Sequence, residues 1–419
     1  VGAQWGDEGK GKVVDLVTER AELVVRYAGG PNAGHTLVVG GEKLIVRLVP
    51  SGILQPHSVC AMAQGMVVDP AVLVSEIAAL TQRGIKTTGR LFISDRAHLI
   101  LPHHILVDGL REGSGAGQKI GTTKKGIGPC YEDKAARRGL RMSDLADLGR
   151  ARKLVAQALE AWSPTIAALG GETPTVDESM KVLEEHAPRL LPLITDTSKL
   201  ADDSIRAGKR VVFEGAQGIL LDLDHGTYPF VTSSSAVAGG ACTGAGVGPT
   251  RLTRVVGITK AYATRVGEGP FPTELKDERG DKLRERGAEF GSVTGRPRRT
   301  GWLDLPALRY AARVSGVDAW AITKLDVLTG LDTVEVCTAY ETPEGTTDDL
   351  PADLDRARPV FTKLPGWKEE IGGARRLEDL PGAARDLVRF IEQRTGAEAY
   401  LVSVGPGREE TITVRDVWG

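Results

Sequence analysis

The sequence predicts an α/β protein with a large, mostly parallel central sheet that is flanked by helices. Short apolar runs, such as residues 23–27 and 318–322, are typical of strands that are buried on both faces. Glycine-rich turns follow these runs, and in parallel sheets such turns lie at the carboxyl ends of the strands, where ligands bind. No low-complexity segment divides the chain, so we expect a single domain over residues 1–419.

The first part of the chain carries clear local signals. A helix over residues 70–83 is indicated by Asp69 at the N-cap, Pro70 at the first helical position and Gly84 beyond the end. The segment 113–129 is too rich in glycine for a helix and is expected to be a loop. Before the helix over 70–83, the sequence predicts a glycine loop at 6–12, a helix over 13–19, and strands at 23–27 and 43–50. A further strand is expected to precede this opening loop at 6–12.

Two segments interrupt the alternation of strands and helices. Residues from about 142 to 208 carry apolar side chains at three- and four-residue steps, which predicts a helical insertion. Residues from about 335 to 372 predict a smaller, strand-rich excursion. A helix over 382–396 and a strand from residue 399 follow.

Composition excludes several classes of function. The chain has 53 basic and 55 acidic residues and a net charge of −2, which argues against a nucleic-acid or membrane-surface protein. No apolar run is long enough for a transmembrane helix, and no signal peptide is visible. The four cysteines lie far apart, as expected for isolated thiols in a reducing compartment. We therefore expect a cytoplasmic protein.

The stretch WGDEGKGK, at residues 5–12, resembles a phosphate-binding loop. Its glycines free backbone N–H groups to face phosphate oxygens, and the helix that follows adds its positive end. Val13 stands where such loops usually carry the Ser or Thr that holds magnesium. Asp7 is unusual here, because a carboxylate in an anion site is costly unless it faces a cation or moves a proton. The alternatives are that Asp7 caps the helix or pairs with Lys10.

The tetrapeptide TKLD, at residues 323–326, follows the predicted strand at 318–322 and has the pattern of a guanine reader. A carboxylate at Asp326 can accept hydrogen bonds from guanine N1–H and from the 2-amino group, both of which adenine lacks. The alternative is a chance tetrapeptide, since Lys and Asp are common.

Three further segments carry candidate ligand-binding residues. GPNAGHT, at 30–36, places Asn32 and His35 in a glycine loop, although His35 could simply face water. The segment 121–141 is the most basic of the chain and suits a phosphate monoester, with a solvated basic face as the alternative. GSVTGRPRRTGW, at 291–302, carries three arginines that can pair with carboxylates.

Taken in this order, these segments resemble the adenylosuccinate synthetase family of purine biosynthesis. The resemblance is carried by QWGDEGKG and GIGPCYEDKAAR, and also by GGPNAGHT, FEGAQG, DHGTYPFVTSS, ATRVGEGPFPTEL, TGRPRRTGWLDL and TKLDVLTGL. It implies a homodimeric ligase that uses GTP and Mg²⁺ to join L-aspartate to IMP, giving adenylosuccinate, GDP and phosphate through 6-phosphoryl-IMP.

The resemblance also implies residue roles. Asp7 would take the N1 proton of IMP and, with Gly34, hold Mg²⁺, so that its carboxylate replaces the hydroxyl missing at position 13. His35 would stabilise the γ-phosphoryl group in transfer, and Gln217 would hold the hypoxanthine ring. Arg137 would act in the neighbouring subunit's IMP site.

The implied binding residues fall into three sets. GTP would be bound by Gly6, Glu8, Gly9, Lys10, Gly11, Lys12, Gly34, Thr36, Arg298, Lys324, Leu325, Asp326, Ser403, Val404 and Gly405. IMP would be bound by Asp7, Lys10, Asn32, Ala33, Gly34, His35, Thr123, Arg137, Gln217, Thr232 and Arg296. Aspartate would be bound by Ser292, Val293, Thr294, Gly295, Arg296 and Arg298.

Some positions depart from the usual bacterial pattern of this family. Pro31 stands where His is frequent, Lys125 where Arg is frequent, and Val293 where Thr is frequent. Two other functions remain open: a GTP-binding regulatory protein, and a catalytically inactive homologue that serves as a scaffold. The regulatory protein would have no use for Arg296 or Thr123, and the intact Asp7 and His35 argue against the scaffold.

Overall fold

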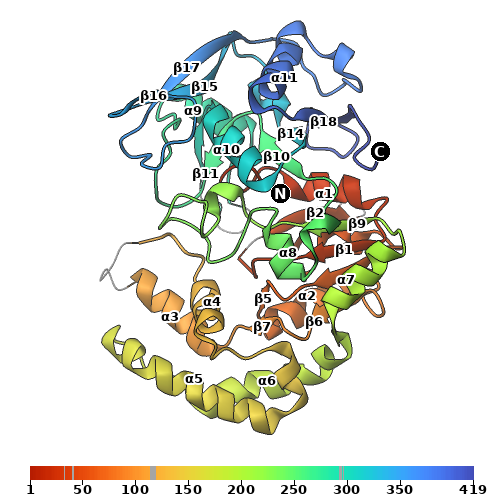
Figure 1. Ribbon diagram of the computed structural model, residues 1–419, viewed down its shortest axis with the longest axis vertical. Coiled ribbons are helices and arrows are strands. Elements are labelled where there is room, and N and C mark those ends of the chain that lie inside the picture. Colours follow the sequence, from red (N-terminus) through yellow and green to blue (C-terminus); the bar gives the residue numbers. More distant parts are fainter. Residues whose placement is uncertain (33, 40–41, 114–118, 292–294, 296) are drawn as a thin grey trace. The chain divides into compact units, whose positions relative to one another are not determined.

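The structure is a computed structural model of the 419-residue chain, and it describes all residues except 33, 40–41, 114–118, 292–294 and 296 (Figure 1). Contacts between residues divide the chain into two compact units. The first unit contains Val1–Val13, Gln217–Pro229 and Leu252–Gly419, and the second contains Val14–Ala216 and Phe230–Arg251. That the whole chain acts as a single domain stays a prediction.

The second unit is built on a five-stranded parallel sheet with strand order β8-β6-β4-β1-β9. The interior strand β1, between β4 and β9, has no exposed residue, which explains why its sequence shows no polar–apolar alternation. This sheet, with its flanking helices, confirms the predicted fold class. Its strands are β1 (Leu23–Arg26), β4 (Val59–Met62), β6 (Leu91–Ser94), β8 (Ile194–Thr195) and β9 (Val211–Glu214).

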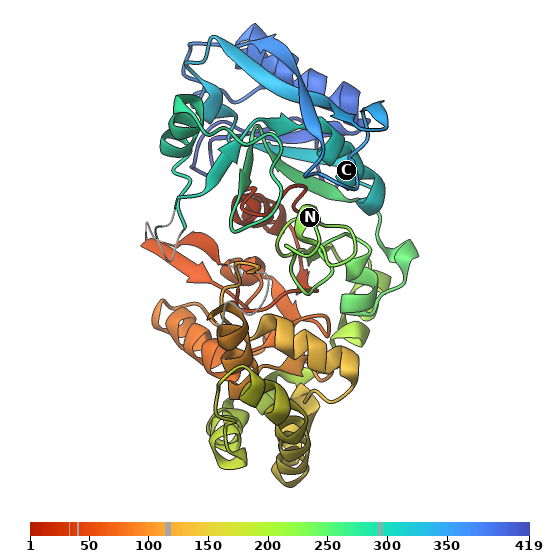
Figure 2. The same cartoon turned by 90° about the vertical axis from the view of Figure 1, so that its left-hand side faces the viewer.

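The helices of the second unit include the predicted helical insertion, in which α5 and α6 lie side by side (Figures 1 and 2). This insertion also contains β8, which joins the edge of the sheet beside β6. The α-helices of this unit are α2 (Pro70–Gln82), α3 (Pro102–Gly113), α4 (Ile127–Ala136), α5 (Leu148–Ala168), α6 (Val176–Leu190), α7 (Thr197–Arg206) and α8 (Gly240–Ala245). Two short strands, β5 (Val67–Val68) and β7 (His98–Leu99), pair with each other.

The strand expected at 43–50 is shorter in the structure and belongs to a hairpin of β2 (His35–Val39) and β3 (Glu42–Val46). It ends at Val46 because the carboxylate of Glu76, on α2, accepts the backbone N–H groups of Arg47, Leu48 and Val49. These N–H groups are therefore not available to a strand ladder.

The loop expected at 113–129 is also shorter, because α4 begins at Ile127. Ile127 and Cys130 pack against Val67 and Ile100 in a buried cluster. The N–H of Gly126, which has a φ of 73°, donates to the Asp108 carboxylate at 2.9 Å. Apolar packing thus starts a helix that the glycine content did not suggest. Residues 114–118 lie outside the described part of the chain.

The first unit contains a four-stranded sheet with order β10-β14-β18-β19, in which only β19 is antiparallel. Gly2 forms a parallel bridge with Ile258, so the start of the chain lies beside β10. The strands are β10 (Val256–Lys260), β14 (Ala319–Thr323), β18 (Glu398–Ser403) and β19 (Thr411–Thr413), and the helices are α9 (Glu278–Arg286), α10 (Leu305–Ser315) and α11 (Gly382–Thr395).

The predicted strand-rich excursion is a mainly antiparallel sheet, in which β15 (Thr333–Thr342) pairs with β16 (Gly345–Thr347) and β17 (Arg358–Pro365). β13 (Leu303–Asp304) adds to it in parallel. A separate hairpin pairs β11 (Ala263–Arg265) with β12 (Arg299–Gly301). The helix α1 (Lys10–Thr18) begins in the first unit and ends in the second.

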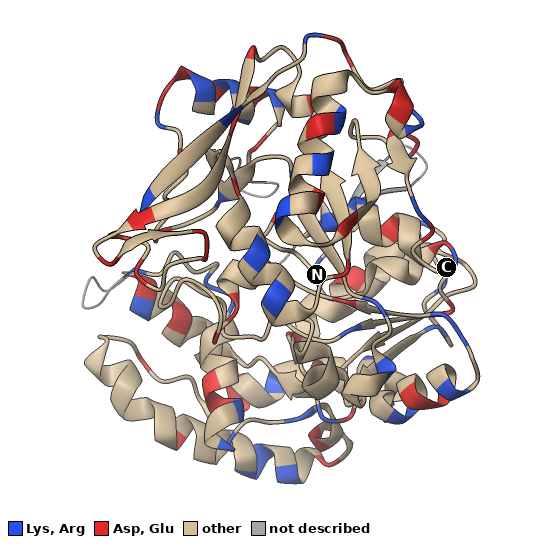
Figure 3. Cartoon of the chain, turned by 45° about the horizontal axis from the view of Figure 1, so that its top comes forward, with Lys and Arg blue, Asp and Glu red and all other residues tan. Residues whose placement is uncertain are grey.

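Acidic and basic residues are interspersed along the ribbon rather than separated by sign (Figure 3). None of the helices within the described residues combines the length and the apolar character that crossing a bilayer requires.

Candidate active site

The opening loop is shaped by Glu8, whose side chain is fully buried. One carboxylate oxygen of Glu8 accepts the N–H groups of Gln4 and Gly6 at 3.0 and 2.9 Å, and the other pairs with Lys10 Nζ at 2.5 Å. Lys10 therefore pairs with Glu8 and not with Asp7. Because α1 begins at Lys10, Asp7 also lies too far upstream to cap that helix. Both alternative roles for Asp7 are excluded in this structure.

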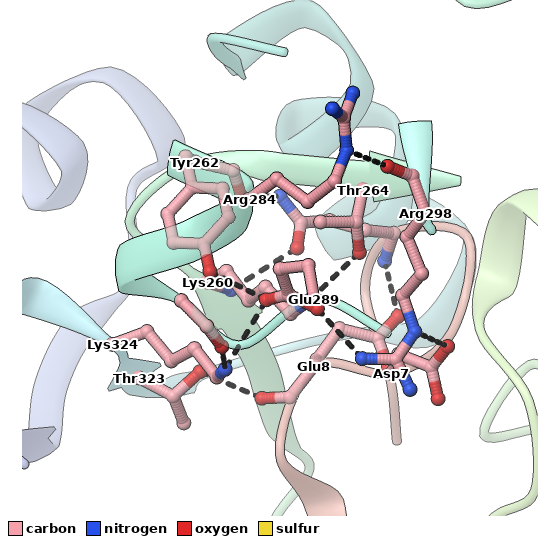
Figure 4. Close-up of polar contacts among 12 residues, drawn as sticks. Asp7, Glu8, Lys260, Tyr262, Thr264, Arg284, Glu289, Arg298, Thr323 and Lys324 are labelled. Atoms are coloured by element: carbon pink, nitrogen blue, oxygen red, sulfur yellow. Dashed lines mark hydrogen bonds and ion pairs between the residues drawn. The ribbon is translucent and has the colours of Figure 1, made fainter. Parts of the chain in front are cut away.

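Asp7 instead forms an ion pair with Arg298, with 2.9 Å between the carboxylate Oδ2 and the guanidinium Nε (Figure 4). The side chain of Asp7 remains 41% exposed, whereas that of Arg298 is only 14% exposed. A second contact holds Arg298 in place, because its Nη1 donates to the buried carboxylate of Glu289 at 2.7 Å. The free face of the Asp7 carboxylate can thus reach a ligand while Arg298 balances its charge.

The predicted guanine reader lies directly after β14. Thr323 Oγ1 donates to the backbone carbonyl of Glu8 at 2.6 Å, which ties this strand end to the opening loop. Lys324 has a φ of 58° and its ammonium donates to the Gly287 carbonyl. Burial raises the pKa of Asp326, which lies in the 3-10 helix η6 (Leu325–Leu328). A carboxylate in such a place forms strong hydrogen bonds with the donors it meets.

Lys12 connects the opening loop to the loop after β18. Its ammonium donates to Ser403 Oγ at 2.7 Å, to the Gly405 carbonyl at 2.7 Å and to the Glu410 carbonyl at 3.1 Å. Burial lowers the pKa of Lys12 to about 8. The opening loop, TKLD and the 403–405 loop, which were selected separately in the sequence, are therefore neighbours within the first unit.

Backbone strain coincides with the predicted site residues. Among the described residues, six that are not glycine have φ in the left-handed region. Four of them are site residues expected from the sequence: Asp7, Arg137, Gln217 and Lys324. Such conformations cost of order 1–3 kcal/mol, persist only where the surrounding structure imposes them, and cluster at active sites. The other two are Lys124 and Ala288.

Apart from Gly295, the remaining described site residues belong to the second unit. Gly34 and Thr123 are exposed, Asn32 and Thr232 are half-buried, and His35 begins β2, where its backbone pairs with Val46. The side chains of His35 and Thr36 lie outside the described part of the chain, as do Ala33, Ser292, Val293, Thr294 and Arg296. Gly295 is exposed and has a φ of 65°. Of the three departures from the family pattern, Pro31 is buried, Lys125 is exposed, and Val293 lies outside the described residues.

Arg137 ends α4 in the left-handed conformation, and this turn separates it from Arg138. Arg138 Nε donates to the buried carboxylate of Asp133 at 2.5 Å, whereas Arg137 is exposed. Asp133 also accepts from Trp162 Nε1 at 2.8 Å and contacts His104 Nε2 at 2.9 Å. Arg138 thus pairs with a buried carboxylate at the helix end, while its neighbour Arg137 stays exposed.

His103, His104 and Asp133 lie close enough together to hold a metal ion. The contacts argue against it. The Leu101 N–H donates to His104 Nδ1 at 3.0 Å, so the proton is on Nε2 and is donated to Asp133. Arg138 already neutralises Asp133. This buried group therefore supports the fold of α3 and α4.

Sequence reasoning missed Glu289 and Lys260, which are both fully buried next to the site. Lys260 Nζ donates to Glu289 Oε1 at 2.7 Å. The sequence held one weak signal, since Glu289 lies two residues before the arginine-rich loop at 291–302. No local pattern marks a carboxylate whose partners come from distant segments.

Comparison with known proteins gives a consistent result. A family model described as adenylosuccinate synthetase matches residues 1–412. The chain is 64% identical over 420 residues to the adenylosuccinate synthetase of Sorangium cellulosum, covering 100% of this chain and 98% of that protein. It is 53% identical over 420 residues to that of Moorella thermoacetica, covering 99% and 98%.

A solved structure described as fully ligated adenylosuccinate synthetase from Plasmodium falciparum is similar with a TM-score of 0.93 and 35% identity, covering 99% of each chain. This similarity extends over the fold as well as the sequence. The chain belongs to the adenylosuccinate synthetase family.

Proposed function

We propose that Asp7 is the residue that takes the N1 proton of IMP in the reaction of this family. As a member of the family, the chain is a ligase of purine biosynthesis that joins L-aspartate to IMP with GTP, giving adenylosuccinate, GDP and phosphate. One observation carries the proposal for Asp7. Its carboxylate is held at a positive φ on a glycine loop, is 41% exposed and is neutralised by Arg298 rather than by Lys10.

The proposed chemistry divides into two steps. Removal of the N1 proton by Asp7 places negative charge on O6 of IMP, which attacks the γ-phosphorus of GTP and releases GDP. His35 stabilises the phosphoryl group in transfer, and Gln217 orients the hypoxanthine ring. The amine of aspartate then attacks C6 of 6-phosphoryl-IMP and phosphate leaves, which is easier than expelling an unmodified carbonyl oxygen.

The donor set suits Mg²⁺, because the Asp7 carboxylate and the Gly34 carbonyl both offer the hard oxygen ligands that this ion prefers. Asp7 keeps an exposed face for such a ligand, and Gly34 is exposed. We propose that these two residues hold the ion. When bound, Mg²⁺ would neutralise charge on the GTP phosphates.

We propose that GTP is bound by the opening loop, by TKLD and by the 403–405 loop. The contacts of Lys12 with Ser403 and Gly405, and of Thr323 with Glu8, support a common site for these segments. Gly34, Thr36 and Arg298 complete the proposed set. IMP would be bound by Asp7, Lys10, Asn32, Ala33, Gly34, His35, Thr123, Arg137, Gln217, Thr232 and Arg296. Aspartate would be bound by residues 292–296 and Arg298.

Phosphate release tests this function against the two alternatives. The ligase requires GTP, IMP and aspartate together, so leaving out any one of them is expected to stop both phosphate release and adenylosuccinate absorbance. A regulatory GTPase would release phosphate from GTP alone, and an inactive scaffold would release none. Either result would overturn the proposal.

Arg137 is proposed to act in the IMP site of a second copy of this chain. Its exposure and left-handed backbone support a role outside its own fold. We expect the variants Arg137→Ala and Asp7→Ala to be inactive alone and to regain activity when mixed. Random pairing would leave one intact site in each mixed dimer, or about a quarter of the original sites. No recovery after proven subunit exchange would contradict action in trans.

The low pKa of Lys12 gives a prediction for pH. Its ammonium is charged below a pH of about 8 and loses its charge above it. We expect the affinity for GTP, measured by direct titration without the other substrates, to fall about tenfold between pH 7 and pH 9. In Lys12→Arg the affinity should not fall in this range, because a guanidinium stays protonated. An unchanged affinity in the original protein would count against a charged role for Lys12.

We also propose a cytoplasmic location. The four cysteines are all unpaired, and burial raises the pKa of Cys60, Cys130 and Cys337, which suits thiols that stay reduced. Cell fractionation with an antibody against the chain tests the location.

A further inference from the structure

Glu289 is a buried carboxylate that none of the proposed roles uses. It lies between α9 and β12, within the first unit. The residue before it, Ala288, has a φ of 47°, and at Gly287 a Cβ atom would lie 2.3 Å from the Tyr262 hydroxyl. Ala288 is one of only two left-handed residues among those described that are neither glycine nor expected site residues. The backbone is thus strained and tightly packed at the two residues that precede Glu289.

The two oxygens of Glu289 face different parts of the site (Figure 4). Oε1 accepts from Lys260 Nζ at 2.7 Å and from the Tyr262 hydroxyl at 2.5 Å, and lies 3.2 Å from Lys324 Nζ. Oε2 accepts from Arg298 Nη1 at 2.7 Å. One carboxylate therefore contacts the lysine of the guanine reader on one side and the partner of Asp7 on the other.

Charge in this cluster fits a permanently ionised Glu289. Burial alone would raise the pKa of Glu289, but the positive charges of Lys260 and Lys324 overcome this effect and lower the pKa to about 2. Burial lowers the pKa of Lys260 to about 8, so Lys260 is charged at neutral pH. The cluster then holds three cations, Lys260, Lys324 and Arg298, and two anions, Glu289 and Asp7.

We infer that Glu289 is a positioning residue that holds Lys324 for guanine and Arg298 for Asp7 at the same time. The inference rests on the roles proposed above for Lys324, Arg298 and Asp7. Glu289 shares the guanidinium, so Arg298 cannot turn fully onto Asp7. Without Glu289, Arg298 would lose the hydrogen bond that fixes it, and Asp7 would lose its fixed partner.

The variant Glu289→Gln keeps the size of the side chain and removes its charge. We expect the KM for GTP to rise about tenfold, because Lys324 loses its anchor, and kcat to fall about tenfold, because Arg298 no longer holds Asp7 in place. A merely structural role would lower the amount of folded enzyme and leave kcat and KM of the folded fraction unchanged. An unchanged kcat, or an unchanged KM for GTP, in folded enzyme would overturn the inference.

A double-mutant cycle tests whether Glu289 acts through Lys324. In a Lys324→Met background, Glu289→Gln should raise the KM for GTP much less than it does in the original protein, since one of the two groups that it positions is gone. Additive effects would contradict the inference. If Lys324→Met alone left the KM for GTP unchanged, the proposed guanine site would fail instead, so the two failures can be told apart.

A matched control and a milder variant complete the design. Glu274 forms a similar ion pair with Arg299, at 2.7 Å, without contacting Lys324 or Arg298. Glu274→Gln should leave kcat and the KM for GTP unchanged. If Glu289→Gln does not fold, Tyr262→Phe removes a single hydrogen bond on the Lys324 side of the carboxylate. It should raise the KM for GTP a few-fold and leave kcat unchanged, and no change in that KM would count against the inference.

Discussion

Replacing Asp7 with alanine is expected to lower kcat by a factor of about 10²–10⁴ while GTP still binds, because a general base contributes about this much to a rate. The fold should persist. The ion pair of Asp7 with Arg298 is partly exposed, and such pairs contribute about 0–1 kcal/mol. Arg298 also keeps its hydrogen bond to Glu289, so no buried cation is left alone. Adenylosuccinate absorbance measures turnover, and titration with GTP measures binding.

A second variant separates proton transfer from shape. Asp7→Asn keeps the size of the side chain but cannot accept a proton, so it should lose about as much activity as Asp7→Ala. Glu19→Ala, which removes an exposed carboxylate just beyond α1, serves as a control and should be fully active. Near-normal turnover in Asp7→Asn would refute the assignment of Asp7 as the base.

Elements with local signals could be predicted from the sequence. Helix α2 begins at Pro70, as predicted, because the Asp69 carboxylate accepts the N–H groups of Ala71 and Val72, and all of these residues are adjacent. The strand predicted at 43–50 failed at its end for the opposite reason. Glu76 takes the N–H groups of residues 47–49, and no pattern near those residues reveals a partner that far along the chain.

The same distinction applies to the site. Asp7 and Asp326 could be proposed from the sequence because each lies in a short motif whose spacing suggests a ligand chemistry. Glu289 could not, because its partners Lys260, Lys324 and Arg298 come from three other positions in the chain and meet only after folding. The pairing of Asp7 with Arg298 rather than with Lys10 is also a tertiary result, since Glu8 removes Lys10 from reach.

Replacing Asp326 with asparagine is expected to lower the preference for GTP over ITP by about 100-fold. Guanine offers two donors, N1–H and the 2-amino group, and hypoxanthine offers only N1–H. An asparagine side chain has one acceptor, and its NH₂ group would face the 2-amino group of guanine, donor against donor. Loss of a charge-assisted hydrogen bond costs about 1.5–3 kcal/mol, which corresponds to about 10–100-fold, and the repulsion between donors adds to it.

The ratio of kcat/KM for GTP to that for ITP measures this preference directly, because kcat/KM compares two substrates of one enzyme. The KM values for IMP and aspartate should not change. Asp332→Asn makes the same chemical change at an exposed carboxylate whose partner is Lys368, so its ratio should equal that of the original protein. Burial raises the pKa of Asp326, so removing its charge should not weaken the fold. A preference that stays unchanged in folded Asp326→Asn would therefore mean that another group reads the base, and the TKLD segment would lose its proposed role.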